Sequence, residues 1–147
     1  MAQMLRNRVR SVGVLLGVLV AAVVLSACNP AAEDQDFAMV NSLRARNGVP
    51  QLARSGELNA KARSQADRMA ARGRIYHSTN LAAGVSPGWR LIGENVAVAG
   101  TIEQAQAALE RSSGHLANMV NAQFTEMGVG VTVSNGQVYV VQVFVSR

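Results

Sequence analysis

The chain has 147 residues, the size of one ordinary domain, and 49% of them are hydrophobic while 16% are charged. This composition excludes both a disordered chain and a polytopic membrane protein. The formal charge is +5, but without the acid-free residues 1–27 eleven basic and nine acidic residues remain, a net charge of +2. Such a small charge argues against a dedicated nucleic-acid binder, which needs a concentrated basic face. The single cysteine, Cys28, excludes an intramolecular disulfide.

The N-terminal residues have the layout of a secretory signal. A basic segment, residues 1–10, precedes an apolar run at residues 12–25 that contains only Val, Leu, Ala and Gly. The run is shorter than the about 20 apolar residues of a membrane-spanning helix. Residues 25–28, Leu-Ser-Ala-Cys, resemble a bacterial lipobox, in which the signal is cut before a lipidated cysteine. The alternatives are an uncleaved anchor and a plain secretory signal.

This resemblance implies a division of the chain into three parts. Residues 1–27 are expected to be a lipoprotein signal peptide, residues 28–35 a lipidated tether, and residues 36–147 the folded domain. Two or three acyl chains on Cys28 anchor a protein stably where one does not. We therefore expect a cell-membrane lipoprotein that faces the extracytoplasmic side, with secretion as the alternative.

Two helices are predicted in the first half of the domain. The first is expected to start at Asp36 as its cap and to run to about residue 46, where the Asn-Gly-Val-Pro sequence at 47–50 ends it. Ser55 is expected to open the second helix, which ends before Gly73.

A basic stripe lies beside the apolar face of the second predicted helix. Lys61, Arg68 and Arg72 share this stripe. A solvated face is favoured over contact with a membrane surface, because most runs of charge are simply solvated.

Residues 73–93 contain four glycines, one proline and several serines and asparagines, and are predicted to form a long loop. Loops of this length are uncommon in a compact domain and are often functional. The elements expected after the loop are a short strand at 94–98, a helix at about 102–112 with a Thr101–Gln104 capping box, a short helix at 114–120, and strands at 127–133 and 137–145.

The C-terminal strands define the fold class. Asn135-Gly136 between two Val-rich runs is a strong hairpin signal. The run at 138–141 is nearly all apolar, which is typical of a strand covered on both faces. Helices before a terminal antiparallel hairpin predict an α+β domain with a sheet between layers of helices.

Three side chains are candidates for chemistry. His77 lies in the long loop, His115 lies at the start of a short helix, and Glu94 lies at a loop-to-strand junction. Each alone is a weak signal, because a lone surface histidine is more often a bystander than a ligand. The sequence contains no HExxH, GxSxG, P-loop or dinucleotide-binding motif.

Five short motifs in order resemble the CAP superfamily, which includes cysteine-rich secretory proteins, antigen 5, plant pathogenesis-related proteins and bacterial SCP-like domains. Any one of them is weakly specific, but together they cover about residues 36–145. The matching stretches are Asn-Ser-Leu-Arg-Ala-Arg-Asn-Gly-Val-Pro-Gln-Leu at 41–52, His-Ser at 77–78, Gly-Glu-Asn-Val-Ala at 93–97, Ser-Gly-His-Leu-Ala-Asn-Met at 113–119, and Met-Gly-Val-Gly-Val at 127–131.

The resemblance implies an α-β-α sandwich with a central antiparallel sheet and a cleft lined by His77, Glu94 and His115. Ser112 stands where the family usually has a second acid, as it does in many bacterial relatives. The remaining supporting residues of the cleft are expected to be Ser78, Asn95 and Asn118. Two imidazoles and one carboxylate suit a divalent transition metal such as zinc with an open water position, and offer too few oxygens for calcium.

Three functions follow. The favoured one is a binding module for a lipid, cell-envelope or protein ligand. The second is a metal-dependent, peptidase-like hydrolase in which His77, Glu94 and His115 hold a metal-bound water, or Glu94 acts as general base. The third is purely structural, with the polar set satisfying buried donors of the long loop. An enzyme is the less favoured expectation, and no nucleic-acid partner is expected.

Overall fold

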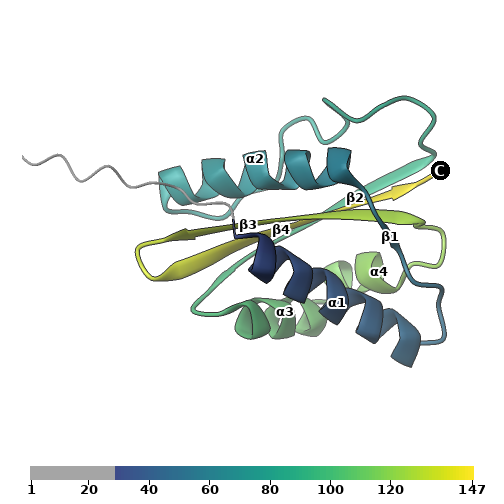
Figure 1. The fold of residues 1–147 in the computed structure, drawn as a ribbon, viewed down its shortest axis with the longest axis horizontal. Coiled ribbons are helices and arrows are strands. Elements are labelled where there is room, and N and C mark those ends of the chain that lie inside the picture. Colours follow the sequence, from purple (N-terminus) through teal and green to yellow (C-terminus); the bar gives the residue numbers. More distant parts are fainter. Residues whose placement is uncertain (1–28) are drawn as a thin grey trace, which may run out of the picture.

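A computed structural model describes residues 29–147 and shows three layers, with a sheet between two layers of helices (Figure 1). Helix α2 covers one face of the sheet, and α1, α3 and α4 cover the other. The described elements are α1 (Pro30–Arg46), β1 (Ala53–Arg54), α2 (Gly56–Arg72), β2 (Leu91–Ala99), α3 (Ile102–Arg111), α4 (Ser113–Val120), β3 (Glu126–Ser134) and β4 (Gln137–Ser146). The predicted α+β class and α-β-α sandwich are confirmed.

The predicted signal peptide, residues 1–27, and the predicted lipidation site, Cys28, lie outside the described residues. Between residues 29 and 147, no helix is long and apolar enough to cross a membrane.

Helix α1 begins earlier than the sequence predicted. The side-chain oxygen of Asn29 accepts a hydrogen bond from the backbone N–H of Ala32 at 3.2 Å, and Pro30 occupies the first turn. Asp36 therefore does not cap the helix; it lies inside it and is fully buried. Residues 30–35, which the sequence assigned to the tether, are helical, because a proline at the first helical position followed by two alanines and a glutamate favours a helix start.

The sheet has the strand order β1-β3-β4-β2, which leaves β2 at one edge. Strand β4 pairs antiparallel with both β3 and β2, and its residues after Gln137 are buried, as predicted for a strand covered on both faces. The turn residues Asn135 and Gly136 have φ values of 50° and 72°, which fits the predicted hairpin turn.

The sheet is not entirely antiparallel, which corrects the expectation. The two-residue strand β1 pairs parallel with β3, where the N–H of Ala53 donates to the Thr125 carbonyl at 2.9 Å and that of Ser55 donates to the Met127 carbonyl at 3.0 Å. A pairing of two residues has no alternating pattern that a sequence can display.

Helix α2 packs on β3 with backbone against backbone. A Cβ atom at Gly128 would lie 2.1 Å from the carbonyl carbon of Leu58, and one at Gly130 would lie 2.2 Å from that of Ala62. The glycines of β3 therefore create the space in which α2 lies. Asn59 of the same helix accepts a hydrogen bond from the Val129 N–H at 2.9 Å, which joins the helix to the strand between the two glycines.

Arg44 joins the end of α1 to the segment between α4 and β3. Its side chain is fully buried and donates to the carbonyls of Pro50, Met119 and Asn121 at 2.6, 2.8 and 2.9 Å. This arrangement gives a physical role to Arg44, the first of the two arginines in the first of the five motifs.

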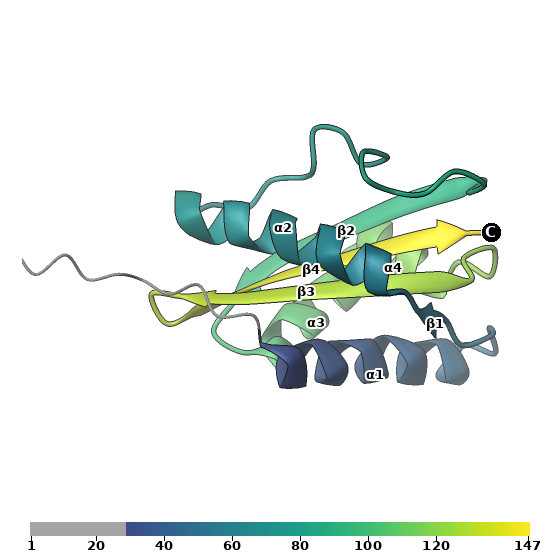
Figure 2. The same cartoon turned by 45° about the horizontal axis from the view of Figure 1, so that its top comes forward.

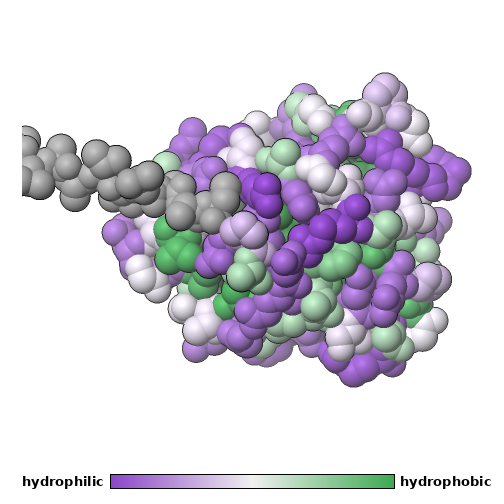
Figure 3. Space-filling model, viewed as in Figure 1, coloured by the Kyte–Doolittle hydropathy of each residue, from purple (hydrophilic) through white to green (hydrophobic). Residues whose placement is uncertain are grey.

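Two apolar clusters fill the spaces between the layers. One lies between the sheet and α1, α3 and α4 and includes Phe144 and Met119, while the other lies under α2 and includes Leu58 and Val143. The long loop contributes to the second cluster, because Trp89 packs against it. On the face drawn in Figure 3, hydrophobic residues lie in separate areas among hydrophilic ones.

Candidate functional site

The two histidines and the glutamate, far apart in sequence, lie together at the edge strand β2. Glu94 is in β2, His77 is in the loop that follows α2, and His115 is in α4 on the opposite side of the sheet. The imidazole rings of His77 and His115 have centroids 6.2 Å apart, with their planes inclined at 37°. The layers meet here because no further strand covers β2.

Glu94 is the buried centre of this site. Its side chain is only 2% exposed, while that of His77 is 57% exposed. One carboxylate oxygen, Oε1, accepts from the backbone N–H of Ser78 at 2.8 Å and lies 2.9 Å from Nδ1 of His77. The other, Oε2, accepts from the Ser78 hydroxyl at 2.5 Å. Because a carboxylate accepts hydrogen bonds, this geometry assigns the hydrogen of the neutral ring to Nδ1 of His77 and leaves the lone pair of Nε2 without a partner among the described residues.

His115 is half-buried beside His77. Burial lowers the pKa of its imidazole, and the neighbouring His77 lowers it further. The lowered pKa favours the uncharged imidazole, which has a nitrogen lone pair available to a ligand.

Two asparagines fix α4 against β2. Asn118 donates to the side-chain oxygen of Asn95 at 2.9 Å and to the Glu94 carbonyl at 3.4 Å. Asn95 in turn donates to the backbone carbonyl of His115 at 3.1 Å. A Cβ atom at Gly93 would lie 3.2 Å from the Asn118 side-chain oxygen. In the Gly-Glu-Asn sequence, the glycine therefore leaves space for Asn118, the glutamate supplies the carboxylate and the asparagine supplies the amide.

The polar set continues into the core, which the sequence analysis missed. Asn95 donates to the side-chain oxygen of Gln142 at 3.1 Å, and the Gln142 amide donates to Gln106 at 3.0 Å and to both carboxylate oxygens of Asp36 at 3.1 and 2.9 Å. Burial raises the pKa of Asp36 to about 7, and the hydrogen bond from Gln142 opposes that rise. The one available signal was Gln142 itself, a polar residue inside an apolar strand.

Of the predicted supporting residues, Ser78, Asn95 and Asn118 contact the site, but Ser112 has a different place. Ser112 connects α3 to α4, where its N–H donates to the Leu109 carbonyl at 3.1 Å and its carbonyl accepts from Leu116 at 2.8 Å. Its side chain makes no capping hydrogen bond to α4.

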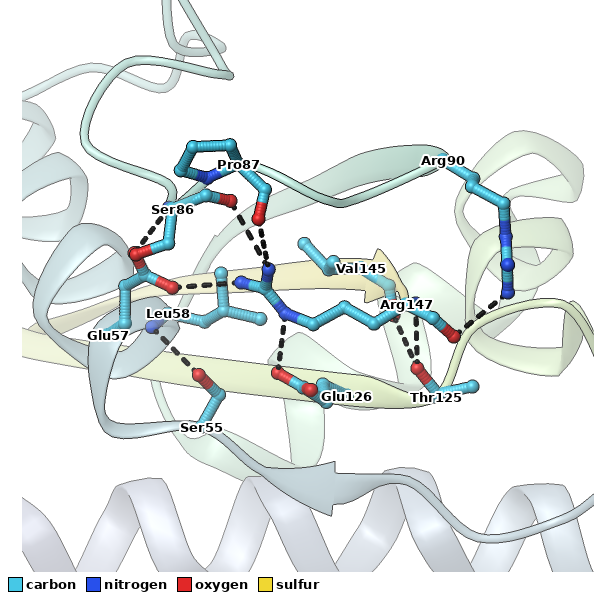
Figure 4. A network of polar contacts seen from close by, with 10 residues as sticks. All are labelled: Ser55, Glu57, Leu58, Ser86, Pro87, Arg90, Thr125, Glu126, Val145 and Arg147. Carbon is cyan, nitrogen blue, oxygen red and sulfur yellow. Dashed lines mark hydrogen bonds and ion pairs between the residues drawn. The ribbon is translucent and has the colours of Figure 1, made fainter.

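The loop that carries His77 is held at its other end by the C-terminal arginine (Figure 4). Arg147 donates to the carbonyls of Ser86 and Pro87 at 3.2 and 3.3 Å and pairs with Glu57 of α2 at 2.9 Å. Glu57 also accepts from the Ser86 hydroxyl at 2.6 Å, and the bonds from Ser86 lower the pKa of this carboxylate. The loop is thus fixed to the domain at both ends.

The three predicted metal ligands, His77, Glu94 and His115, do not form a three-ligand site in the described chain. Among residues 29–147, no three His, Cys, Asp or Glu side chains are arranged to hold a metal ion together. Glu94 instead accepts three hydrogen bonds. The atoms left to a metal are one nitrogen each on His77 and His115, with Glu94 in the supporting position that carboxylates commonly take behind a histidine ligand.

The fold, the two histidines on either side of a Gly-Glu-Asn strand and the motif order define one class of protein. The model of the cysteine-rich secretory protein family matches residues 37–144, and the chain belongs to this CAP family. No curated protein matches the chain.

Solved structures share the fold. An extracellular SCP-domain protein from Bacillus anthracis is 27% identical, with a TM-score of 0.70 over 80% of this chain and 41% of its own. An outer surface protein from Borrelia burgdorferi is 16% identical, with a TM-score of 0.71 over 84% of this chain and 99% of its own. NaASP2 with Zn²⁺ is 17% identical, with a TM-score of 0.58 over 80% of each chain. The present chain spans about two fifths of the length of the Bacillus protein.

Proposed function

We propose that the chain is an extracytoplasmic binding module, in preference to an enzyme, and that its site is the imidazole pair of His77 and His115. The observation that carries the proposal is the environment of Glu94. A general base must reach the proton that it removes, but this carboxylate is 2% exposed and accepts hydrogen bonds from Ser78 and His77. Glu94 is suited to positioning an imidazole, which counts against the form of the hydrolase alternative in which it acts as general base.

The proposal includes a divalent transition metal such as zinc held by His77 Nε2 and a nitrogen of His115. Such an ion supplies a Lewis acid with coordination positions left for water or a donor atom of the ligand. The two nitrogens that have no partner among the described residues and the carboxylate behind His77 fit this role. A structural relative, NaASP2, has been crystallised with Zn²⁺.

The ligand is proposed to be a lipid, cell-envelope or protein component outside the membrane, with Cys28 lipidated. The extracellular Bacillus protein and the Borrelia outer surface protein support this location. Because α1 begins at Pro30, a lipid on Cys28 would hold the domain directly against the membrane instead of on a flexible tether. Cys28→Ser should release the protein or stop its processing, and continued membrane retention at mature size would contradict lipidation.

Zinc titration calorimetry on the purified chain tests the site. His77→Ala and His115→Ala should each weaken zinc binding at least tenfold, because each removes one of two ligands. Glu110→Gln is the control and should leave zinc binding unchanged, since among residues 29–147 the Glu110 carboxylate accepts only from Gln106. Zinc binding unchanged in the double histidine variant would overturn the metal site.

The binding role is tested with envelope lipid extracts and a peptide library. The wild-type chain should retain a lipid fraction that the double histidine variant loses, with both proteins folded by circular dichroism. Zinc-dependent cleavage of peptides by the wild type, lost in the same variant, would contradict a module without catalysis. Loss of thermal stability in the variant together with unchanged ligand retention would favour the structural alternative.

A further inference from the structure

A cavity of about 700 Å³ lies between helix α2 and the long loop. One wall is the outer face of α2, and the other is the loop, which runs back beside the helix toward β2 (Figure 2). The α2 wall contains the three residues of the basic stripe, Lys61, Arg68 and Arg72. The stripe that the sequence assigned to a solvated helix face is therefore one side of a hollow.

Neutral groups hold these cations in place. Lys61 donates to the carbonyls of Ala83 and Asn80 at 2.7 and 3.4 Å, which joins the helix to the loop. Arg68 donates to the Ser64 hydroxyl at 2.7 Å and to the side-chain oxygen of Gln65 at 2.7 and 3.1 Å. These contacts orient the side chains without neutralising their charge.

Aromatic stacking orients the third cation. The Arg72 guanidinium lies 5.0 Å from the centre of the Tyr76 ring, and Arg74 lies 5.4 Å from it. Gln65, which is buried and holds Arg68, donates to the Tyr76 carbonyl at 2.6 Å, so the helix and the loop fix this part of the cavity together.

The charge of the cavity is not neutralised by ion pairs. Within the described chain, Lys61, Arg68 and Arg72 form none. The one acid that lines the cavity is Glu57, whose carboxylate is already bound by Ser86 and Arg147. Burial lowers the pKa of the Lys61 amine, and repulsion from Arg68 also lowers it, against an opposing attraction from the Glu94 carboxylate. Cations crowded in a concave, walled site attract an anion more strongly than the same charges spread over a convex surface.

We propose that this cavity binds a small soluble ligand that carries two or more phosphate groups. Arg68 lies seven positions after Lys61, and Arg72 lies four positions after Arg68, which places the three along about 16 Å of helix. That length suits a ligand with several anionic groups in a row. The guanidinium groups provide paired N–H donors for phosphate oxygens, and Ser64, Thr79 and Asn80 supply further polar groups on the cavity wall. The concave shape favours a soluble phosphate compound over the flat surface of an anionic bilayer.

The site is separate from the imidazole pair and does not depend on the proposed function. Ser78 is the one residue common to the cavity lining and the hydrogen bonds of Glu94. A ligand in the cavity would thus lie beside the histidines without replacing a contact that they make.

Titration calorimetry with tripolyphosphate tests this proposal on the purified chain. The double variant Arg68→Gln/Arg72→Gln should weaken binding at least tenfold. Arg46→Gln is the matched control, because Arg46 also lies on an exposed helix face and donates to a serine four residues earlier, Ser42, at 2.9 Å. This control should change the dissociation constant by less than twofold, and the affinity of the wild type should fall as salt rises.

Further arms separate the sources of phosphate and the two sites. The chain should bind vesicles of phosphatidylglycerol no more tightly than it binds tripolyphosphate. Binding to vesicles without binding to tripolyphosphate would overturn the proposal in favour of a membrane surface. His77→Ala/His115→Ala should keep tripolyphosphate affinity, while the double arginine variant should keep zinc affinity. No tripolyphosphate binding by the wild type, or an equal loss in Arg46→Gln, would also overturn it.

Discussion

Nδ1 of His77 lies 2.9 Å from Oε1 of Glu94, and this pair joins the long loop to the edge strand of the sheet. The same carboxylate accepts both hydrogen bonds that Ser78 donates, so one buried acid orients an imidazole and fixes the start of the loop. The site therefore supports the loop structurally, and it also presents imidazole nitrogens that have no partner among the described residues.

Glu94→Gln should change the tautomer of His77. The amide cannot accept at both of its polar atoms, so Ser78 and His77 compete for one oxygen, and the preference for hydrogen on Nδ1 is lost. Nitrogen chemical shifts of the His77 ring measure the change directly, and Glu110→Gln should leave them unaltered. A His77 ring that stays in the same tautomer in Glu94→Gln would show that Glu94 does not orient it.

Stability should fall as pH rises from about 4 to about 7 because of Asp36. Its pKa is about 7 in the folded protein, above the ordinary value of 3.8, so in this window the unfolded chain has released the proton that the folded protein still holds. Fewer protons on the unfolded state mean that unfolding becomes easier with pH, by up to about 4 kcal/mol. Below about pH 4 Asp36 is protonated in both the folded and the unfolded state, and above about pH 7 the loss of stability stays constant.

Asp36→Asn isolates this effect, because an asparagine does not titrate. The difference in unfolding free energy between the variant and the wild type, from urea titrations at pH 4.5 and pH 7.5, should move in favour of the variant at the higher pH. A difference that is the same at both pH values would contradict a raised pKa for Asp36.

Gly128→Ala and Gly130→Ala should each destabilise the domain by roughly 3 kcal/mol or more, because the new methyl group meets the backbone of α2 and cannot be relieved by a side-chain rotation. Gly56→Ala is the control, since a Cβ atom there has no neighbour within 4 Å. It should change stability by less than about 1 kcal/mol. Equal melting temperatures for all three variants would refute the close packing of α2 on β3.

Tyr76→Phe should leave the fold intact and raise its stability by about 1 kcal/mol. The Tyr76 hydroxyl is buried and has no hydrogen-bond partner among residues 29–147, so removing it removes an unpaired polar group. Thermal unfolding measures the effect, and the ring that stacks with Arg72 and Arg74 is kept. A loss of stability in this variant would mean that the hydroxyl has a partner in solution.

The sequence alone determined the features that depend on neighbouring residues. Ser55 and Thr101 cap their helices as predicted, with Ser55 accepting from the Leu58 N–H at 3.4 Å and Thr101 from that of Gln104 at 3.3 Å. The Asn135-Gly136 turn and the apolar strand after it were also predictable. Caps, turns and periodicity are decided within a few residues, and the order of the five motifs identified the family.

Tertiary structure decided what depends on distant parts of the chain. Asp36 has the side chain of a helix cap, but Gln142, more than a hundred positions later, holds it in the core. The distance between His77 and His115 depends on β2 lying at the edge of the sheet, which follows from strand order and not from any local pattern. The basic stripe became the wall of a cavity for the same reason, because the loop covers it only after the chain has folded back along α2.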